Sequence, residues 1–328
     1  MVRRSAVGEG PPILVEKLVK VYGKTRAVDG LDLQVERGGV VAVLGPNGAG
    51  KTTLIRILAT LAKPSGGRAL VAGFDVAQHP AQVRRRIGIA GQSESIDEYL
   101  TGRQNLVMMG ELSRLSRGEA KRRAGDLLDR FELSEAADRT TKTYSGGMRR
   151  KLDLAASLIT HPEVLFLDEP TTGLDPRARM GMWQLIRELG AAGTTLLLTT
   201  QYLDEADQLA HHIAVVGQGR VIAWGTPDQL KTQVGGAVLE VTLPAAADAE
   251  EAGRLLRSAI SAPVTVDVRR HRLNLPATAA TGLVTTVVRA LDAGGVEVDD
   301  VSVRRPALDD VFMSLTGHGA EPPVEDAA

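Results

Sequence analysis

The stretch Gly45-Pro46-Asn47-Gly48-Ala49-Gly50-Lys51-Thr52-Thr53 decides the fold of this chain. It fits the spacing G-x-x-x-x-G-K-[ST], the pattern of a loop whose backbone N–H groups surround the phosphates of a nucleotide. Glycine lets the backbone wrap around a phosphate because it has no Cβ to clash. In this pattern Lys51 is placed to reach the β- and γ-phosphates, and the Thr52 hydroxyl is placed to bind Mg²⁺.

The residues on either side of the loop predict a strand and a helix. Val40–Leu44 is an unbroken apolar run, typical of a strand buried on both faces of a parallel sheet. After the loop, apolar residues at i, i+3, i+4 and i+7 predict a helix with one buried face: Leu54, Ile57, Leu58 and Leu61. The loop therefore ends at a helix N-terminus, where free N–H groups and the helix dipole favour a polyphosphate. An incidental glycine-rich turn is the alternative, and both flanking elements argue against it.

A second apolar strand ends in two adjacent carboxylates. Val164-Leu165-Phe166-Leu167 is followed directly by Asp168 and Glu169. In open α/β sheets the ligand crevice lies at the carboxyl ends of the strands. Asp168 is placed there to hold Mg²⁺, and Glu169 to polarise an attacking water. Neighbouring carboxylates in a purely structural strand end would repel each other without compensation.

The composition bounds the class of protein. The chain has 328 residues, 43% of them apolar, which is enough for one large domain and a smaller one. A net charge of −1 argues against a general nucleic-acid binder, and the absence of cysteine excludes disulfides and thiol chemistry. The first ten residues lack the apolar segment of a signal peptide, and no apolar run reaches the ~18 residues needed to span a membrane.

The pattern of strands and helices predicts two domains. Strands and helices alternate over residues 13–234, which favours a mostly parallel α/β sheet with a charged helical subdomain at about 93–163. Residues 235–316 show the order β-α-β-β-α-β of a small α+β, ferredoxin-like domain. Its last strand carries Val296, Val298, Val301 and Val303, with a phase slip that suggests a bulge. We expect residues 1–12 to be disordered and 317–328 to be a flexible tail.

Two further features are weak when taken alone. Tyr22, ahead of the glycine-rich loop, is placed to stack on a purine base, although a half-buried tyrosine at a strand end is the simpler interpretation. Ser145-Gly146-Gly147 opens a predicted helix and so offers a second anion site, but Ser-Gly-Gly is also a common turn.

The order and spacing of all these motifs resembles the ATPase subunits of ABC transporters, over roughly residues 13–234. The resemblance implies a P-loop ABC ATPase domain and a head-to-tail homodimer with two ATP molecules between its subunits. Each ATP would lie between the P-loop of one subunit and Ser145-Gly146-Gly147 of the other, with Asp175 acting across the interface. Gln92 would sense Mg²⁺ and the attacking water.

Two positions depart from the usual pattern of that family. Tyr144 and Met148 flank the Ser-Gly-Gly core in place of Leu and Gln, and Gln201 replaces the usual histidine after the last core strand. A glutamine amide can donate a hydrogen bond to the γ-phosphate, but it carries neither a proton to transfer nor a positive charge. More of the chemistry is therefore expected of Glu169.

The segments that contain these departures resemble those of the daunorubicin/doxorubicin-resistance ATPases. The C-terminal segment Leu308-Asp309-Asp310-Val311-Phe312 shows the same resemblance. This closer resemblance runs nearly end to end. It implies the ATP-hydrolysing subunit of an antibiotic-resistance exporter, peripheral on the cytoplasmic face of the membrane, with a separate integral membrane permease as partner. The cargo would be an anthracycline or another amphipathic natural product. The C-terminal domain would serve in regulation or assembly.

Two alternatives remain at this stage. A soluble ABC-type ATPase acting on DNA or ribosomes usually has two ATPase modules or long coiled-coil insertions, and neither is present. A protein that only sequesters a planar drug would need aromatic side chains to stack on it, and aromatic residues make up 3% of the chain.

Overall fold

The computed structural model describes residues 10–91, 95–234, 237–245, 247–260, 262–277, 282–304 and 308. Its contacts divide the chain into two units, Met1–Pro227 and Asp228–Ala328. The sequence placed this boundary after residue 234, seven residues later. The helix α8 (Pro227–Val234) begins at the structural boundary, which the sequence does not mark by any loss of apolar residues.

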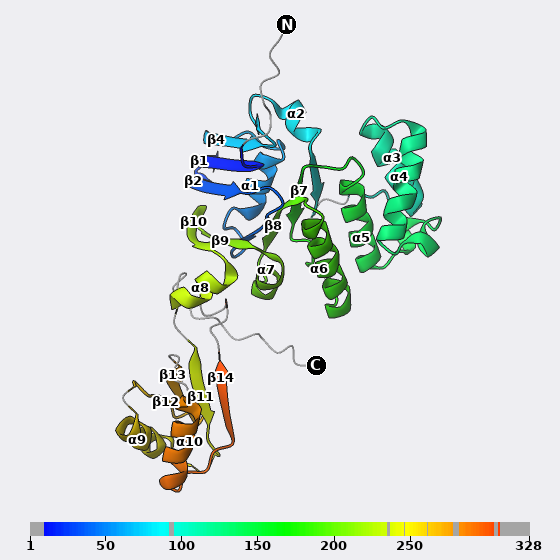
Figure 1. Ribbon diagram of the computed structural model, residues 1–328. Helices are drawn as coiled ribbons and strands as arrows, with labels where there is room; N and C mark the ends of the chain where they lie inside the picture. Colours follow the sequence, from blue (N-terminus) through cyan, green and yellow to red (C-terminus); the bar gives the residue numbers. More distant parts are fainter. Residues whose placement is uncertain are drawn as a thin grey trace. The chain divides into compact units, whose positions relative to one another are not determined.

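The first unit contains a six-stranded sheet that carries the glycine-rich loop (Figure 1). Its strands lie in the order β10 (Arg220–Gly225), β9 (His212–Gly217), β3 (Val40–Leu44), β8 (Thr195–Thr200), β7 (Val164–Asp168) and β6 (Ile87–Ala90). All neighbouring pairs are parallel except β10 with β9. Every residue of β3, β7 and β8 is buried, and the apolar runs at residues 40–44 and 164–167 agree with this for β3 and β7.

A second, antiparallel sheet faces the first. It has the order β2 (Thr25–Val35), β1 (Ile13–Tyr22), β4 (Gly66–Val71) and β5 (Phe74–Asp75). The strands β1 and β2 form a long hairpin, although the charged residues Glu16 and Lys17 interrupt the apolar alternation of β1. The structure keeps the strand continuous with a bulge there, where Lys17 has φ +46°. Pro12, expected to be disordered, is buried, and its carbonyl accepts a hydrogen bond from Ala72 N at 2.7 Å.

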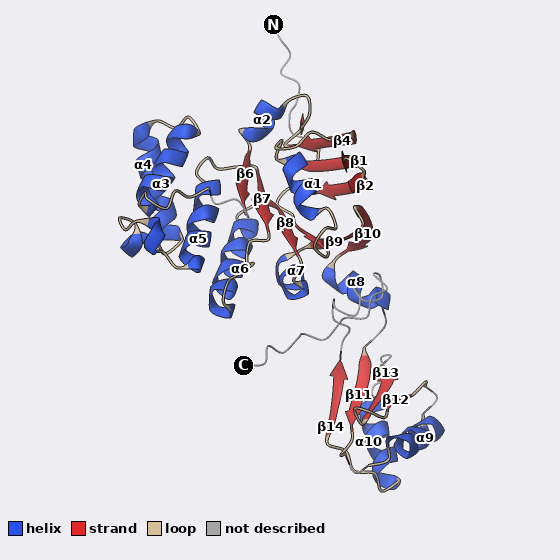
Figure 2. Ribbon diagram, turned by 180° about the vertical axis from the view of Figure 1, so that it is seen from behind, coloured by secondary structure: helices blue, strands red, loops and turns tan. Residues whose placement is uncertain are grey.

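Helices cover the two faces of the parallel sheet (Figure 2). The helix α1 (Lys51–Leu58) contributes to a buried apolar cluster formed with strands of both sheets. The remaining helices of this unit are α2 (Pro80–Arg84), α3 (Gly102–Leu112), α4 (Arg117–Arg130), α5 (Gly146–Ser157), α6 (Pro176–Ala191) and α7 (Leu203–Leu209), with 3-10 turns at Ser134–Ala136 and Thr141–Thr143. Capping boxes set the starts of α3 and α4, at Thr101 with Gln104 and at Ser116 with Glu119.

The predicted apolar face of α1 was one residue too long. Leu54, Ile57 and Leu58 are buried, but Leu61 lies beyond the helix and is 60% exposed. The chain leaves the helix through Thr60, whose φ of +63° is not helical. Leu61 therefore lies outside the helix and does not pack in the core.

The second unit has its own sheet in the order β12 (Thr265–Asp267), β13 (Arg272–Pro276), β11 (Val238–Thr242) and β14 (Asp300–Arg304), all antiparallel. With α9 (Ala249–Ala259) and α10 (Leu283–Ala293) this is the ferredoxin-like arrangement that the sequence predicted. The expected bulge in the last strand was wrong. β14 begins at Asp300, and Val296 and Val298 pack against the apolar core from the segment before the strand.

Among the described residues, no helix combines the length and the apolar character needed to cross a lipid bilayer.

Candidate functional site

The glycine-rich loop joins the carboxyl end of β3 to the first turn of α1. Gly50 has φ +102°, and a Cβ at this position would lie 2.1 Å from the Ala27 carbonyl oxygen, so no other residue fits. The first turn of α1 has no side-chain cap and no acidic residue. Its N–H groups are therefore open to an anion, as expected of a phosphate-binding loop.

Lys51 is buried against the loop that precedes it. Its side chain is 4% exposed, and Nζ donates hydrogen bonds to the carbonyl oxygens of Gly45 at 2.7 Å and Pro46 at 3.1 Å. Nζ also lies 3.6 Å from Oε1 of Glu169. Burial lowers the pKa of Lys51, while the neighbouring Glu169 carboxylate raises it. The ammonium group thus stands inside the loop with partners that a phosphate can replace.

Two threonine hydroxyls contact the carboxylate of Asp168. Its Oδ1 accepts hydrogen bonds from Thr52 Oγ1 at 3.2 Å and from Thr199 Oγ1 at 2.5 Å. Hard oxygen donors of this kind suit Mg²⁺, which keeps several waters and binds through one or two carboxylates plus the substrate phosphates. Within the described ranges no group of three or more His, Cys, Asp or Glu could hold a metal by itself. The residues present therefore fit Mg²⁺ shared with a nucleotide better than a closed protein cage.

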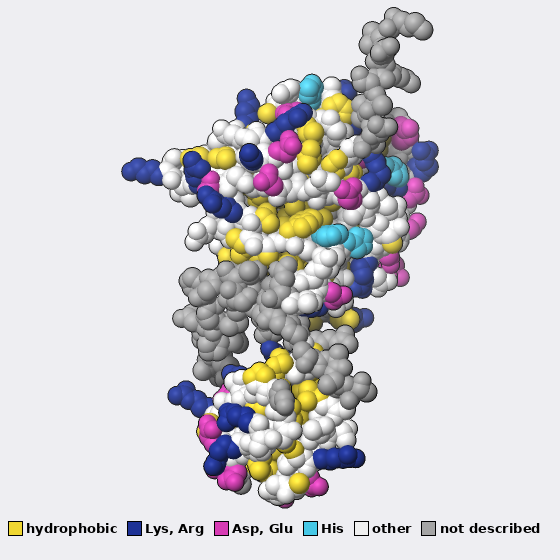
Figure 3. Space-filling model, turned by 60° about the vertical axis from the view of Figure 1, so that its left-hand side comes forward, with side chains coloured by type: hydrophobic (Ala, Val, Ile, Leu, Met, Phe, Trp, Pro, Cys, Tyr) yellow, Lys and Arg dark blue, Asp and Glu magenta, His cyan; other side chains and the backbone are white. Residues whose placement is uncertain are grey.

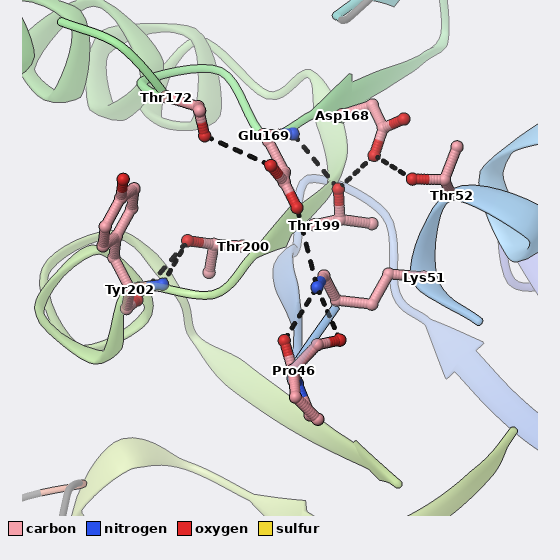
Figure 4. Close-up of polar contacts among 10 residues, drawn as sticks. Pro46, Lys51, Thr52, Asp168, Glu169, Thr172, Thr199, Thr200 and Tyr202 are labelled. Atoms are coloured by element: carbon pink, nitrogen blue, oxygen red, sulfur yellow. Dashed lines mark hydrogen bonds and ion pairs between the residues drawn. The ribbon is translucent and has the colours of Figure 1, made fainter. Parts of the chain in front are cut away.

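Glu169 follows β7 in a backbone conformation that is rare for a residue with a side chain. Its φ is +51°, and its N–H donates to both the carbonyl and the hydroxyl oxygen of Thr199, each at 3.1 Å. Oε2 accepts a hydrogen bond from Thr172 Oγ1 at 3.2 Å. Figure 4 shows the carboxylate between Lys51 and Thr172, with Thr199 beneath both acidic residues. These contacts hold the carboxylate toward the loop at a conformational cost of about 1–3 kcal/mol.

Sequence reasoning did not assign a role to Thr199 or Thr172. Thr199 is fully buried and pairs in register with Asp168 across β7 and β8. The signal was present, since two threonines end an otherwise apolar strand whose carboxyl end lies at the same edge as the acidic residues. The sequence alone does not show that β8 lies beside β7, so it does not show that Thr199 contacts Asp168.

Arg150 connects the Ser-Gly-Gly helix to the same site. From α5, its Nη1 donates to the Gly91 carbonyl at 2.8 Å and its Nη2 to the Glu169 carbonyl at 3.2 Å. Gly91 directly precedes Gln92, which lies outside the described residues, so the structure gives no position for that predicted sensor. The guanidinium nevertheless fixes the backbone before Gln92 to the backbone of Glu169.

The other predicted residues lie at the surface around this cluster. Ser145 is the N-cap of α5 and Asp175 the N-cap of α6; each accepts a hydrogen bond from its own helix. Both are exposed. Gln201 is half buried and follows Thr200 at the end of β8. Tyr22 ends β1, is 48% exposed, and has the Lys20 ammonium 4.8 Å from its ring centroid. The structure thus brings together Lys51, Thr52, Asp168 and Glu169. No hydrogen bond or ion pair among the described residues joins Ser145, Asp175, Gln201 or Tyr22 to this cluster.

Comparison with known proteins identifies this arrangement. The family model described as ABC transporter matches residues 28–172. Daunorubicin resistance ATP-binding protein DrrA3 of Streptomyces coeruleorubidus is 54% identical, over 93% of this chain and 96% of the relative. The chain belongs to the ABC transporter ATP-binding family. Daunorubicin/doxorubicin resistance ATP-binding protein DrrA of Streptomyces peucetius is 53% identical, over 93% and 92% of the two chains.

Solved structures of ABC ATPases share the fold of the first unit. One described as cbiO1 from Clostridium perfringens, part of the ABC transporter complex cbiONQ, has a TM-score of 0.63 and 29% identity, covering 69% of this chain and 92% of that one. An ATP binding subunit of an ABC transporter has a TM-score of 0.61 and 30% identity, covering 67% and 92%. The chain is accordingly an ABC ATPase that binds and hydrolyses ATP, as the sequence predicted, and neither alternative class is favoured.

Proposed function

We propose that this chain powers a two-component exporter that moves an anthracycline or a related amphipathic natural product through a separate membrane subunit. The observation that carries the ATPase part is the meeting of Lys51, Thr52, Asp168 and Glu169 at the carboxyl ends of β3 and β7. The names of the relatives, which are daunorubicin and doxorubicin resistance proteins, support the choice of cargo.

In the proposed mechanism the loop from Gly45 to Thr53 surrounds the ATP phosphates, and Tyr22 stacks on the adenine. Lys51 exchanges its contacts with the Gly45 and Pro46 carbonyls and with Glu169 for the γ-phosphate, because the phosphate carries more negative charge than the neutral carbonyls and the single carboxylate that it replaces. Thr52, Asp168 and Gln92 would hold Mg²⁺, which would neutralise charge on the phosphates. Glu169, released from Lys51, accepts a proton from the attacking water. Gln201 donates a hydrogen bond to the γ-phosphate.

The site is completed by a second copy of the chain. Ser145 and Gly146 are exposed and Gly147 is half-buried at the start of α5, where the first N–H groups of a helix have no partner within the helix. In a head-to-tail homodimer they donate to the γ-phosphate held by the partner, and Asp175 acts across the same interface. Donors that arrive from the other subunit neutralise transition-state charge as an arginine finger does.

The membrane part of the exporter is a separate permease, and the ATPase works at the cytoplasmic face of the membrane. We assign nucleotide binding to residues 13–234, with the helical subdomain of about 93–163 docking onto the permease. We assign regulation or assembly to residues 235–316. Most of the expected N-terminal segment and all of the tail at 317–328 lie outside the described residues.

Anthracycline accumulation in sensitive cells tests the proposal. One strain would express the chain alone, a second the chain with its candidate permease, and a third the permease with Lys51→Ala. We expect lower accumulation only with the permease and an intact Lys51. If the chain alone lowers accumulation, and the strain with Lys51→Ala shows the same decrease, the protein sequesters the drug and does not export it. No change in any strain would remove the drug assignment and leave the ATPase.

A further inference from the structure

The first unit contains a second cavity at the opposite end of β3 from the nucleotide site. It has a volume of about 710 Å³ and lies between the antiparallel sheet and the amino ends of the parallel strands. Gly39 and Val41, at the start of β3, line it, whereas the phosphate-binding loop follows Leu44. The two ends of this strand are about 13 Å apart at ~3.3 Å per residue. A molecule in the cavity therefore leaves the nucleotide site free.

The floor of the cavity is apolar. Leu14 of β1 and Val221 of β10 are half-buried along it, and Val15, Leu33 and Val41, each 5% exposed or less, also border it. Figure 3 shows the corresponding face of the first unit, where hydrophobic side chains form a band beside histidines. A volume of several hundred cubic ångströms with an apolar lining is typical of sites for small organic molecules.

One wall carries a pair of stacked rings. The His212 and Trp224 rings lie 5.3 Å apart between centroids and are inclined by 8°. Trp224 borders the cavity and is 41% exposed, although a tryptophan of an ordinary strand is mostly covered. Next to this pair, His211 Nδ1 accepts a hydrogen bond from Val40 N at 3.2 Å, which fixes its ring against β3. Trp224 therefore presents the exposed part of its indole, backed by the His212 ring, to a flat ligand.

The Asp, Glu, Lys and Arg side chains among the described lining residues are all acidic. Three carboxylates line it, Glu16, Asp32 and Glu36, and none of the described lining residues is Lys or Arg. Asp32 is held in place by a hydrogen bond of 2.7 Å from Lys17 N to Oδ1, and Gln34 donates to Glu36 Oε1 at 2.6 Å. An indole face and carboxylates both favour a cation, whereas an anion would be repelled.

We infer that this cavity is a binding site for a flat, apolar organic cation, separate from the nucleotide site. The apolar floor takes the body of the ligand, Trp224 stacks on its aromatic plane, and Glu16, Asp32 and Glu36 pair with its charge. The inference does not depend on the exporter role.

Ethidium, a planar fluorescent cation, is a suitable probe for the full-length chain. We expect saturable binding of one ethidium per chain that weakens with added salt. Trp224→Ala should weaken it about tenfold, the scale of a lost cation–π and stacking contact. Asp32→Asn, which keeps the acceptor for Lys17 N, should weaken it and reduce its salt dependence. Lys51→Ala should leave it unchanged.

Tyr99→Ala is the matched control, because Tyr99 is also an exposed aromatic residue, at 73%, away from the cavity. It should bind ethidium as the unaltered chain does. Retained ATP binding shows that Trp224→Ala is folded; if this variant does not fold, Asp32→Asn decides. If either Trp224→Ala or Asp32→Asn binds ethidium as tightly as the unaltered chain does, the inference is overturned. So would binding of the anion anilinonaphthalene sulfonate in the same cavity as tightly as ethidium.

Discussion

Replacing Glu169 with glutamine removes a negative charge 3.6 Å from the Lys51 ammonium and keeps the size of the side chain. The amide oxygen can still accept the hydrogen bond from Thr172, and the backbone contacts with Thr199 are unaffected. The substitution therefore isolates the charge. It changes two properties that are measured separately, the rate of ATP hydrolysis and the stability of the nucleotide-free chain.

The distance sets the size of the stability effect. Two unit charges 3.6 Å apart attract by about 5 kcal/mol at an effective dielectric constant of ~20. Removing one partner of a buried pair costs about 3–5 kcal/mol in practice. Lys51 keeps its two carbonyl acceptors. We therefore expect the unfolding free energy of the first unit to fall by about 3 kcal/mol, the lower end of this range. For catalysis, loss of a general base slows turnover at least about 100-fold, which is about 2.7 kcal/mol in the barrier.

ATP should restore the lost stability but not the lost turnover. ATP supplies Lys51 with a new anionic partner, so saturating ATP should recover most of the lost stability of Glu169→Gln, whereas turnover stays low. Denaturation is followed by tryptophan fluorescence, since Trp183 and Trp224 both lie in the first unit. Phosphate release gives the turnover. Glu188→Gln, at an exposed site on α6, is the control and should change neither. Turnover of Glu169→Gln equal to that of the unaltered chain would refute the assignment of the base.

Two other substitutions probe the surroundings of the site, and a third probes a histidine that precedes β7. Thr199→Val removes the hydroxyl that donates to Asp168 and accepts from Glu169 N; it should cost about 1–3 kcal/mol of unfolding free energy and lower turnover, and an unchanged denaturation midpoint would contradict this. Gln201→His should keep or raise phosphate release, because imidazole also donates a hydrogen bond; complete loss would mean that the site requires the amide. The side chain of His161 is exposed, but partial desolvation, and then the charge of Arg123, lowers its pKa from the usual 6.5. The unfolded chain then binds a proton that the native chain does not, so the unfolding free energy should fall as pH decreases from about 6.5 toward the lowered pKa. His161→Gln should flatten this dependence, and an unchanged pH profile would exclude His161 as its source.

The sequence predicts best where a local pattern and its chemistry coincide. The loop at 45–53 and the carboxylates after β7 could be found because strand, turn and side-chain type lie next to each other along the chain. Thr199 and Arg150 could not, because their roles depend on which strands are neighbours and on where α5 meets the sheet. Leu61 was assigned to a helix that had already ended, since apolar period alone does not reveal the positive φ of Thr60.

The ferredoxin-like order was predicted for a similar reason, since each element carries its own period. The last strand was placed too early because Val296 and Val298 are half-buried against the apolar core without being in a strand. Burial and strand pairing are separate properties, and the alternation of apolar residues reports only the first of them.

The second unit buries its own apolar cluster, which includes Leu239, Val241, Leu256, Leu273 and Leu291. A cluster closed within one unit can melt without the other, so heating this chain should not give a single two-state transition. A scanning calorimetry trace should contain two components, and ATP should shift only the one that belongs to the nucleotide-binding unit. A single melting temperature would therefore misstate the effect of a substitution, because it averages a unit that responds with one that does not.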